Sequence, residues 1–229
     1  TKKISVIPNG VNAKKFENIS KIRDKYRTLF EIKNKKVILF VGGKHYPSIQ
    51  AIPFIEHITQ KFPDVIFYIV GGVNESSKSH SNVRYTGRVD DIIPYFAIAD
   101  LAINPITTGT GSNIKLLEYL AAGIPCVSTK YGIRAAQLKD GKDVLLAEDE
   151  SQFFNQINYL LKDDSLRKLI AENGRKAVEK YDWNILARKL EKILKQFSWV
   201  FVKNLNFKFV KLIKRFRWIY LYEESVIDF

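Results

Sequence analysis

A lysine and a glutamate follow a glycine-rich segment in the middle of the chain, at a spacing that suits anion binding. The segment reads T-T-G-T-G-S-N-I-K-L-L-E over residues 107–118. Lys115 and Glu118 are three residues apart, so on a helix they share one face. Lys115 falls in the expected first turn, where the helix macrodipole disfavours a cation unless an anion shares the site. A surface Lys–Glu pair is the alternative, and the glycines favour the anion site because they let backbone approach a ligand closely.

The flanking residues predict how this pair is presented. Apolar residues recur at the spacing of one helix face: Leu116, Leu117, Leu120 and Ala121. Ser112 or Asn113 is expected to cap this helix, Gly123 to end it, and residues 126–127 to form the next buried strand. A glycine loop that leads from a strand into a helix N-terminus offers free N–H groups and a positive dipole end to a phosphate.

Apolar runs alternate with helical patterns along the rest of the chain. Short runs predict strands at residues 4–8, 37–41, 65–70, 83–86, 101–103 and 144–147. Helical patterns cover residues 21–30 (with Ser20 as cap), 48–62, 90–97, 151–161, 165–180 and 183–197. This alternation predicts an α/β fold: a doubly wound, Rossmann-like parallel sheet with a helical C-terminal extension.

Glycine turns follow several of the expected strands. They are Gly42-Gly43, Gly71-Gly72, Gly87 and the loop at residues 109–111. In a doubly wound sheet the ligand lies in the crevice beyond the carboxyl ends of the strands. We therefore expect the four turns to gather on one edge of the sheet, around a ligand.

Composition narrows the function classes. The 229 residues are 46% hydrophobic, ample for a core, and carry a net charge of +13, which favours anionic partners without choosing among phosphates, acidic lipids and nucleic acid. Cys126 is the one cysteine, so no internal disulfide forms, and it is expected to be a core residue. The three histidines lack metal-ligand spacing, so we expect no metal site and no cofactor. The sequence contains no methionine, which predicts a processed product or a fragment.

Several motifs together resemble one protein family. They are I-P-N-G-V-N at 7–12, F-V-G-G at 40–43, G-R-V-D-D at 87–91 and G-T-G-S-N-I-K-L-L-E-Y-L-A-A-G-I-P-C-V-S-T at 109–129. They resemble the C-terminal nucleotide-sugar-binding domain of retaining glycosyltransferases of the GT-B fold, glycosyltransferase family 4 (group 1) type. The resemblance covers residues 4–197. It implies half of a GT-B fold, with the acceptor-binding N-terminal domain absent from this chain.

The resemblance also implies roles for individual residues. Glu118 would bind the ribose hydroxyls, Lys115 and the loop amides would hold the diphosphate, and backbone at Arg88 and Val89 would meet the base. We predict Lys115 and Glu118 as catalytic residues. The predicted substrate-binding residues are Gly42, Gly43, Lys44, Arg88, Val89, Gly109, Thr110, Gly111, Ser112, Asn113 and Ile114.

This chain departs from the family pattern at three positions. Thr110 stands where the family often has a glutamate that contacts the donor sugar, and Ser48 stands where a lysine is usual. Gly43 replaces a common arginine, and Lys44 is the candidate substitute.

The function predicted from the sequence is donor binding in a metal-independent glycosyltransferase that moves a sugar from a nucleotide diphosphate sugar to a saccharide or lipid-linked acceptor with retention. Such an enzyme would serve cell-surface polysaccharide biosynthesis in the cytoplasm or at the inner face of the cell membrane. Without its N-terminal domain the chain is expected to be inactive. A non-catalytic nucleotide- or anion-binding module that docks on membranes is the alternative. A sugar-nucleotide epimerase is disfavoured, because the sequence offers no set of acids and histidine to move a proton.

The C-terminal tail, residues 198–229, differs from the domain at 1–197. Basic residues interleave there with aromatic ones: Lys203, Lys208, Lys211, Lys214, Arg215 and Arg217 with Trp199, Phe201, Phe207, Phe209, Phe216, Trp218 and Tyr220. A terminal helix that packs its aromatics on protein is the first interpretation. An anionic membrane surface is the second, and nucleic acid is an unlikely third.

Overall fold

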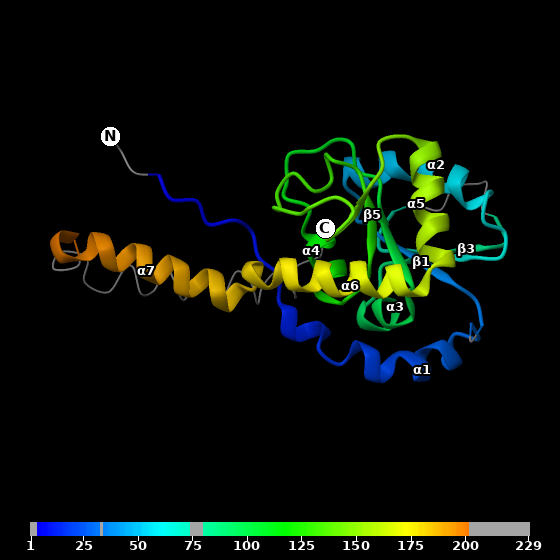
Figure 1. Ribbon diagram of the computed structural model, residues 1–229, viewed down its shortest axis with the longest axis horizontal. Helices are drawn as coiled ribbons and strands as arrows, with labels where there is room; N and C mark the ends of the chain where they lie inside the picture. The colour runs from blue at the N-terminus through cyan, green and yellow to red at the C-terminus, as the bar shows by residue number, and fades with distance from the viewer. Residues whose placement is uncertain (1–3, 33, 74–79, 202–229) are drawn as a thin grey trace. The chain divides into compact units, whose positions relative to one another are not determined.

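The computed structural model describes residues 4–32, 34–73 and 80–201, with side chains described up to residue 195 (Figure 1). The chain forms two compact units, one of Pro8–Leu186 and one of Thr1–Ile7 with Ala187–Phe229. All strands of the described residues belong to the first unit. The predicted basic and aromatic tail lies outside the described residues except for the backbone of 198–201, and the predicted boundary at residue 197 stays a prediction.

A single six-stranded, all-parallel sheet forms the centre of the Pro8–Leu186 unit, in the order β3-β2-β1-β4-β5-β6. Its strands are β1 (Val37–Val41), β2 (Ile66–Val70), β3 (Val83–Gly87), β4 (Leu101–Asn104), β5 (Cys126–Ser128) and β6 (Leu145–Leu146). The order proceeds outward from β1 in one direction and from β4 in the other. The predicted doubly wound sheet is confirmed, with its topological switch point between β1 and β4.

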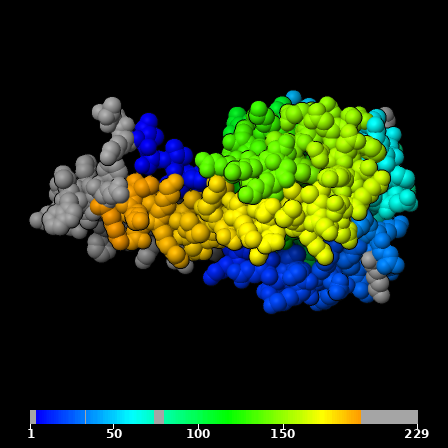
Figure 2. Space-filling model, viewed as in Figure 1, coloured from blue at the N-terminus to red at the C-terminus, as the bar shows by residue number. Residues whose placement is uncertain are grey.

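Helices cover both faces of this sheet (Figure 1). They are α1 (Ile19–Leu29), α2 (Tyr46–Thr59), α3 (Ile93–Ile98), α4 (Ile114–Ala121), α5 (Glu150–Lys162) and α6 (Asp164–Val178), with 3₁₀ turns at Ala13–Phe16 and Glu179–Tyr181. A further helix, α7 (Trp183–Phe201), begins in this unit and lies mostly in the other one. One core cluster joins α1, α3 and α4 to one sheet face, and the other joins α2 and α5 to the opposite face. In the space-filling view, α5 and α6 form much of the surface of this unit that faces the reader (Figure 2).

Alternate residues of β1 supply the two clusters, as the period of a strand requires. Val37 and Leu39 pack in one cluster, and Ile38 and Phe40 in the other. Cys126 on β5 is fully buried, as predicted, and burial raises the pKa of its thiol above the usual range. No helix in the part of the chain that the structure describes is both long enough and apolar enough to traverse a bilayer.

The helix ends show how local sequence sets the boundaries. Asp149 and Asp163 cap α5 and α6, and each carboxylate accepts a hydrogen bond of 2.8 Å from a first-turn N–H. Gly123 ends α4 with φ +70°, as predicted, and lets the next N–H, on Ile124, return to the carbonyl of Tyr119 at 2.9 Å.

Two expectations near the N-terminus are wrong. Residues 4–8 form no strand, because no strand edge pairs with them; the first pairing is an isolated parallel bridge between Val11 and Asp182. Ser20 does not cap α1, which begins at Ile19 with Asn18 in the cap position and no side-chain cap bond.

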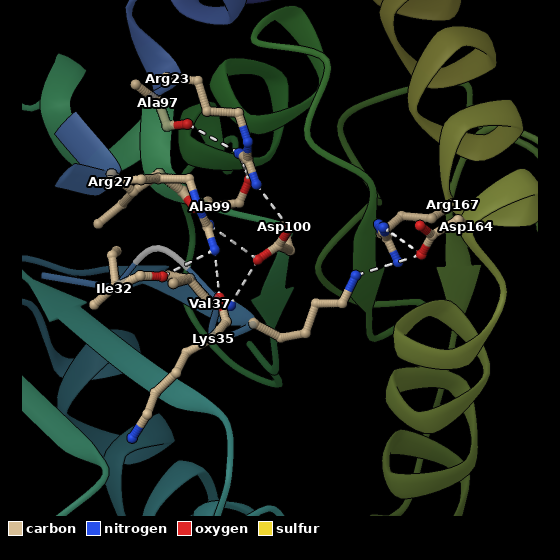
Figure 3. A network of polar contacts seen from close by, with 12 residues as sticks. Arg23, Arg27, Ile32, Lys35, Val37, Ala97, Ala99, Asp100, Asp164 and Arg167 are labelled. Atoms are coloured by element: carbon tan, nitrogen blue, oxygen red, sulfur yellow. Dashed lines mark hydrogen bonds and ion pairs between the residues drawn. The ribbon is translucent and has the colours of Figure 1, made fainter. Parts of the chain in front are cut away.

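A charged network closes the amino-terminal edge of β1 and β4 (Figure 3). Asp100 precedes β4, and its Oδ2 accepts from the backbone N–H of Val37, the first residue of β1, at 2.8 Å. Arg23 and Arg27 of α1 pair with the same carboxylate at 2.7 and 3.3 Å. The two guanidiniums also donate to the carbonyls of Ala97, Ile98, Ala99, Ile32 and Lys35. Burial lowers the pKa of Arg23 from its usual value.

Candidate functional site

The glycine turns predicted to gather at the carboxyl edge of the sheet lie side by side there. Gly42 donates its N–H to the carbonyl of Val70 at 2.9 Å, and Gly71 donates to Gly87 at 3.0 Å. Gly71 has φ +115°, and a Cβ at this position would lie 2.2 Å from the Gly42 carbonyl oxygen. Only glycine fits a backbone approach this close. The ends of β1, β2 and β3 are therefore joined backbone to backbone.

The first turn of α2, which follows the turn after β1, also reaches the loop after β4. Gly109 has φ +109°, and a Cβ there would lie 2.6 Å from Cγ of Pro47. Gly72 lies beside the side chain of Lys44, whose Cγ would be 3.2 Å from an added Cβ. Gly43 is half-buried and Lys44 is exposed. The structure thus brings the predicted Gly42, Gly43 and Lys44 to the same carboxyl edge of the sheet, here called the rim, as the loop at residues 109–111.

At the switch point, the backbone pairing of β1 with β4 ends before either strand does. The backbone pairing of β1 with β4 covers Ile38↔Leu101 and Leu39↔Ala102 and then stops. Two residues later, the N–H of Val41 donates to the hydroxyl of Tyr119 on α4, 2.6 Å away. Burial raises the pKa of Tyr119 well above its usual value, so the hydroxyl stays neutral. Tyr119 therefore satisfies the backbone where the strands part, and it ties α4 to the end of β1.

In the loop after β4, two glycine carbonyls are occupied, while the neighbouring backbone donors have no acceptor among the described residues. Tyr131 donates its hydroxyl to the Gly109 carbonyl, and Arg134 donates to the carbonyls of Gly109, at 3.1 Å, and Gly111. In the described part of the chain, no acceptor pairs with the backbone N–H groups of residues 109–115. A run of unpaired N–H groups that leads into a helix N-terminus has the geometry of an anion-binding site, so this loop is the candidate site.

The side chains expected to cap α4 do not do so. Asn113 occupies the cap position, but its side chain makes no cap bond, and its Nδ2 donates instead to Oδ1 of Asn104 at 2.7 Å. Ser112 accepts through Oγ from the side-chain amide of Asn9. The predicted cap is therefore wrong in its contacts, because tertiary partners take both side chains. The first turn of α4 keeps its donors.

Buried polar groups at the ends of β4 and β5 support the start of α4 through hydrogen bonds. Asn104 ends β4, is 2% exposed, and donates its Nδ2 to Oγ of Ser128 on β5 at 2.8 Å. Gly132 approaches so closely that a Cβ there would lie 2.4 Å from the same Nδ2. Asn113 is thus hydrogen-bonded to a buried, closely packed side chain at the end of β4.

Lys115 and Glu118 form the predicted pair on α4. Nζ of Lys115 lies 2.9 Å from Oε2 of Glu118, and the side chains are 43% and 18% exposed. Leu116, Leu117 and Leu120 fill the buried side of the same helix. Thr110, Gly111 and Ile114 are exposed beside the pair. An accessible cation next to unpaired N–H groups adds positive charge to this candidate anion site.

Arg88 and Val89 lie at the far end of the rim. They follow Gly87, which ends the edge strand β3 with φ +65°. Arg88 is exposed, and Val89 is half-buried against the core. β2 and β1 separate β3 from β4, so the two turns are about 14 Å apart at a strand spacing of about 4.8 Å. The predicted base contact and the predicted diphosphate contact therefore occupy different parts of one rim.

Sequence reasoning missed Tyr131, Arg134 and Asn104. Asn104 carried a usable signal, because a polar residue at the carboxyl end of an apolar strand lies at the ligand edge of such a sheet. Tyr131 and Arg134 carried none, since they lie in a segment without periodicity. No group of three or more metal-ligating side chains occurs among the residues that the structure describes.

The fold and the sequence both have known relatives. The family model described as glycosyl transferases group 1 matches residues 35–163. A phosphatidyl-myo-inositol mannosyltransferase of Mycobacterium leprae is 29% identical over 203 residues, which cover 82% of this chain and 52% of the relative. This chain spans about half the length of the curated relatives it matches.

Solved structures agree with the fold. HepE of Anabaena, whose crystal structure contains UDP and glucose, superposes with a TM-score of 0.71 at 20% identity, over 83% of this chain and 56% of HepE. The C-terminal domain of a glycosyl transferase group 1 family protein, LpcC of Francisella tularensis, gives a TM-score of 0.59 at 19% identity, over 74% of this chain and 96% of that domain.

Proposed function

Because this chain belongs to the family of glycosyl transferases group 1, we propose that it binds the donor, a nucleotide diphosphate sugar, for a transferase that retains configuration. The observation that carries this proposal is the run of unpaired backbone N–H groups at residues 109–115, beside Lys115. HepE, a protein of the same fold, was crystallised in complex with UDP, which supports the same class of ligand here.

The diphosphate would bind at the loop after β4 and the start of α4. Backbone N–H groups there donate to phosphate oxygens, and the helix N-terminus contributes a positive partial charge. Lys115 lies in the first turn and would add a full charge. These donors are fixed before the ligand arrives, so they stabilise developing negative charge without reorganisation.

The nucleoside would extend along the rim from Glu118 toward β3. A carboxylate accepts hydrogen bonds from both hydroxyls of a ribose, and Glu118 is accessible for this. Lys115 holds the Glu118 carboxylate at 2.9 Å and would orient it while facing the diphosphate. The base would then meet the backbone at Arg88 and Val89, and Gly42, Gly43 and Lys44 would lie between the base and the diphosphate.

In the reaction, the bond from the sugar's anomeric carbon to the diphosphate breaks, and the diphosphate leaves with the electron pair. Lys115, the loop amides and the α4 terminus stabilise that charge. The acceptor hydroxyl attacks from the same face, and its proton passes to the leaving phosphate, because none of the predicted site residues is a general base. No metal ion is required in this scheme.

The acceptor, a saccharide or a lipid-linked sugar, would be bound by a second domain that faces this rim. The Mycobacterium leprae relative is named as a transferase to a phosphatidyl-myo-inositol, which supports a lipid-linked acceptor. Transfer would then occur in the cytoplasm or at the inner face of the membrane. Since catalysis needs both reactants held together, we expect this chain alone to bind donor and to transfer no sugar.

Calorimetric titration of the full chain with UDP and GDP tests the donor proposal. Glu118→Ala should weaken binding of the preferred nucleotide by about 1.5–3 kcal/mol, because a charged acceptor is lost. Glu172→Ala is the matched control, since Glu172 pairs with Lys176 at 2.7 Å on an exposed face of α6. Chelation of metal ions should leave the titration unchanged.

Two results would contradict this proposal. Equal affinity in wild type and Glu118→Ala would remove Glu118 from the site. Binding of inorganic pyrophosphate as tightly as of either nucleoside diphosphate would favour a general anion-binding module over a donor site.

A further inference from the structure

Tyr131 and Arg134 contact the loop after β4 through the carbonyl groups of Gly109 and Gly111. The Arg134 guanidinium donates to the carbonyls of Gly109, Gly111 and Tyr131, the last at 3.0 Å. The Tyr131 hydroxyl donates to the Gly109 carbonyl as well. Both terminal nitrogens of the guanidinium are therefore engaged with the backbone, although the side chain is exposed.

Because the peptide bond is planar, the direction of each of these carbonyls also fixes the direction of the N–H group that follows it. In a trans peptide, the N–H of one residue points opposite to the carbonyl of the residue before it. No cis peptide occurs in the described chain. With the carbonyls of Gly109 and Gly111 turned toward Arg134, the N–H groups of Thr110 and Ser112 point away from it. Both of these N–H groups lack an acceptor among the described residues.

Arg134 is held in place for this task. Its guanidinium lies 4.0 Å from the centroid of the Tyr131 ring, a stacked cation–π arrangement. The planar guanidinium fork can bridge two carbonyls at once, which a lysine ammonium on a flexible stem does less well. Stacking also reduces the entropy that an exposed arginine loses when it is fixed.

We propose that Tyr131 and Arg134 are positioning residues for the donor diphosphate: they fix the peptide groups after Gly109 and Gly111 so that the N–H groups of Thr110 and Ser112 face the phosphate oxygens. This inference rests on the proposed function. It assigns the two residues an effect on phosphate binding that they exert through the loop, without touching the ligand.

Three variants of the full chain separate positioning from charge. Tyr131→Phe removes one hydroxyl and leaves the stacked ring. Arg134→Lys keeps the positive charge and loses the fork, and Arg134→Met loses both. The probes are UDP, GDP and their nucleosides, uridine and guanosine, measured by calorimetry. Melting temperature is recorded for each variant.

We expect nucleoside diphosphate affinity to fall about threefold in Tyr131→Phe and about tenfold, ~1.4 kcal/mol, in Arg134→Lys and Arg134→Met. Affinity for the nucleoside and the melting temperature should stay at the wild-type values, because the base contacts and the core are untouched. Lys25→Met is the matched control: it removes an exposed cation that lies 5.6 Å from a tyrosine ring centroid on α1.

Each contrary outcome points to one claim. If wild type binds UDP or GDP and both Tyr131→Phe and Arg134→Lys bind it equally well, the positioning role is wrong and the proposed function stands. If Arg134→Lys matches wild type while Arg134→Met is weak, Arg134 acts by its charge, which also overturns positioning. If wild type binds neither nucleotide, the proposed function fails, and this inference fails with it.

Discussion

The two edges of the β1–β4 strand pair use arginine in the same way and reach opposite results. At the amino edge, Arg23 and Arg27 cover backbone carbonyls, and the carboxylate of Asp100 accepts from both arginines and from the N–H of Val37 (Figure 3). At the carboxyl edge, Arg134 also covers carbonyls, but no carboxylate accepts from the neighbouring N–H groups among the described residues.

The two edges differ in the balance of hydrogen-bond donors and acceptors. The amino edge pairs donors with acceptors, as buried polar groups require. The carboxyl edge leaves an excess of donors beside Lys115, which only an added anion would balance. We therefore expect the amino edge to contribute to stability and the carboxyl edge to nucleotide binding.

We expect the largest effect on stability from a change at the amino edge, which is the closed edge because Asp100 pairs with its donors. Asp100→Ala should destabilise the protein by about 3–5 kcal/mol, because it leaves two guanidiniums without their counter-charge where Asp100 is 8% exposed. Urea denaturation measures this. Asp164→Ala is the control, since Asp164 pairs with Arg167 at 2.6 Å but is 65% exposed, so its loss should destabilise the protein far less than the loss of Asp100.

The same Asp100→Ala variant also tests whether the two edges act independently, through its nucleotide affinity. The folded Asp100→Ala protein should bind nucleoside diphosphate as wild type does, because the carboxyl edge is unchanged. The separation of the two edges would be refuted by an Asp100→Ala variant that is as stable as Asp164→Ala, or by one that is folded and does not bind.

We expect a smaller effect, on nucleotide affinity, from placing a carboxylate at the carboxyl edge beside its unpaired N–H groups. Asn113→Asp places a carboxylate at the uncapped start of α4, where it can accept from first-turn N–H groups and occupy the anion site with negative charge. Nucleoside diphosphate affinity should fall about tenfold, ~1.4 kcal/mol. Stability should change by less than about 1 kcal/mol, because the new cap offsets the lost bond to Asn104.

Titration and denaturation on the same preparation check this prediction, and Asn113→Ser serves as the neutral comparison. Unchanged affinity in Asn113→Asp would mean that the phosphate does not bind at the α4 terminus. A drop of equal size in Asn113→Ser would assign the effect to the lost Asn104 contact and not to charge.

The sheet could be predicted from the sequence because its signals are local. A buried parallel strand is a continuous apolar run, and residues 37–41 and 101–103 show this without tertiary information. Gly123 likewise marks the end of α4, because its φ of +70° favours glycine. The same local logic failed at residues 4–8, since a strand also needs a neighbour to pair with.

The site could be predicted only in its outline. The contact between Lys115 and Glu118 could be predicted because their spacing fixes their relation on a helix. The side-chain partner of Asn113 could not be predicted. Its choice between capping α4 and bonding Asn104 depends on a residue nine positions away on another element. Arg134 was hidden for the same reason, since its carbonyl partners lie more than twenty residues earlier in the chain.

The central claim is that the N–H groups of residues 109–115 bind the diphosphate of a nucleotide. Amide NMR of the ¹⁵N-labelled chain, titrated with UDP and with GDP, tests it residue by residue. We predict that the largest downfield shifts of amide protons fall within residues 109–115, with Thr110 and Ser112 among them, while Val37 at the closed edge does not move. Saturable nucleotide binding that leaves the amides of 109–115 unshifted would contradict the claim.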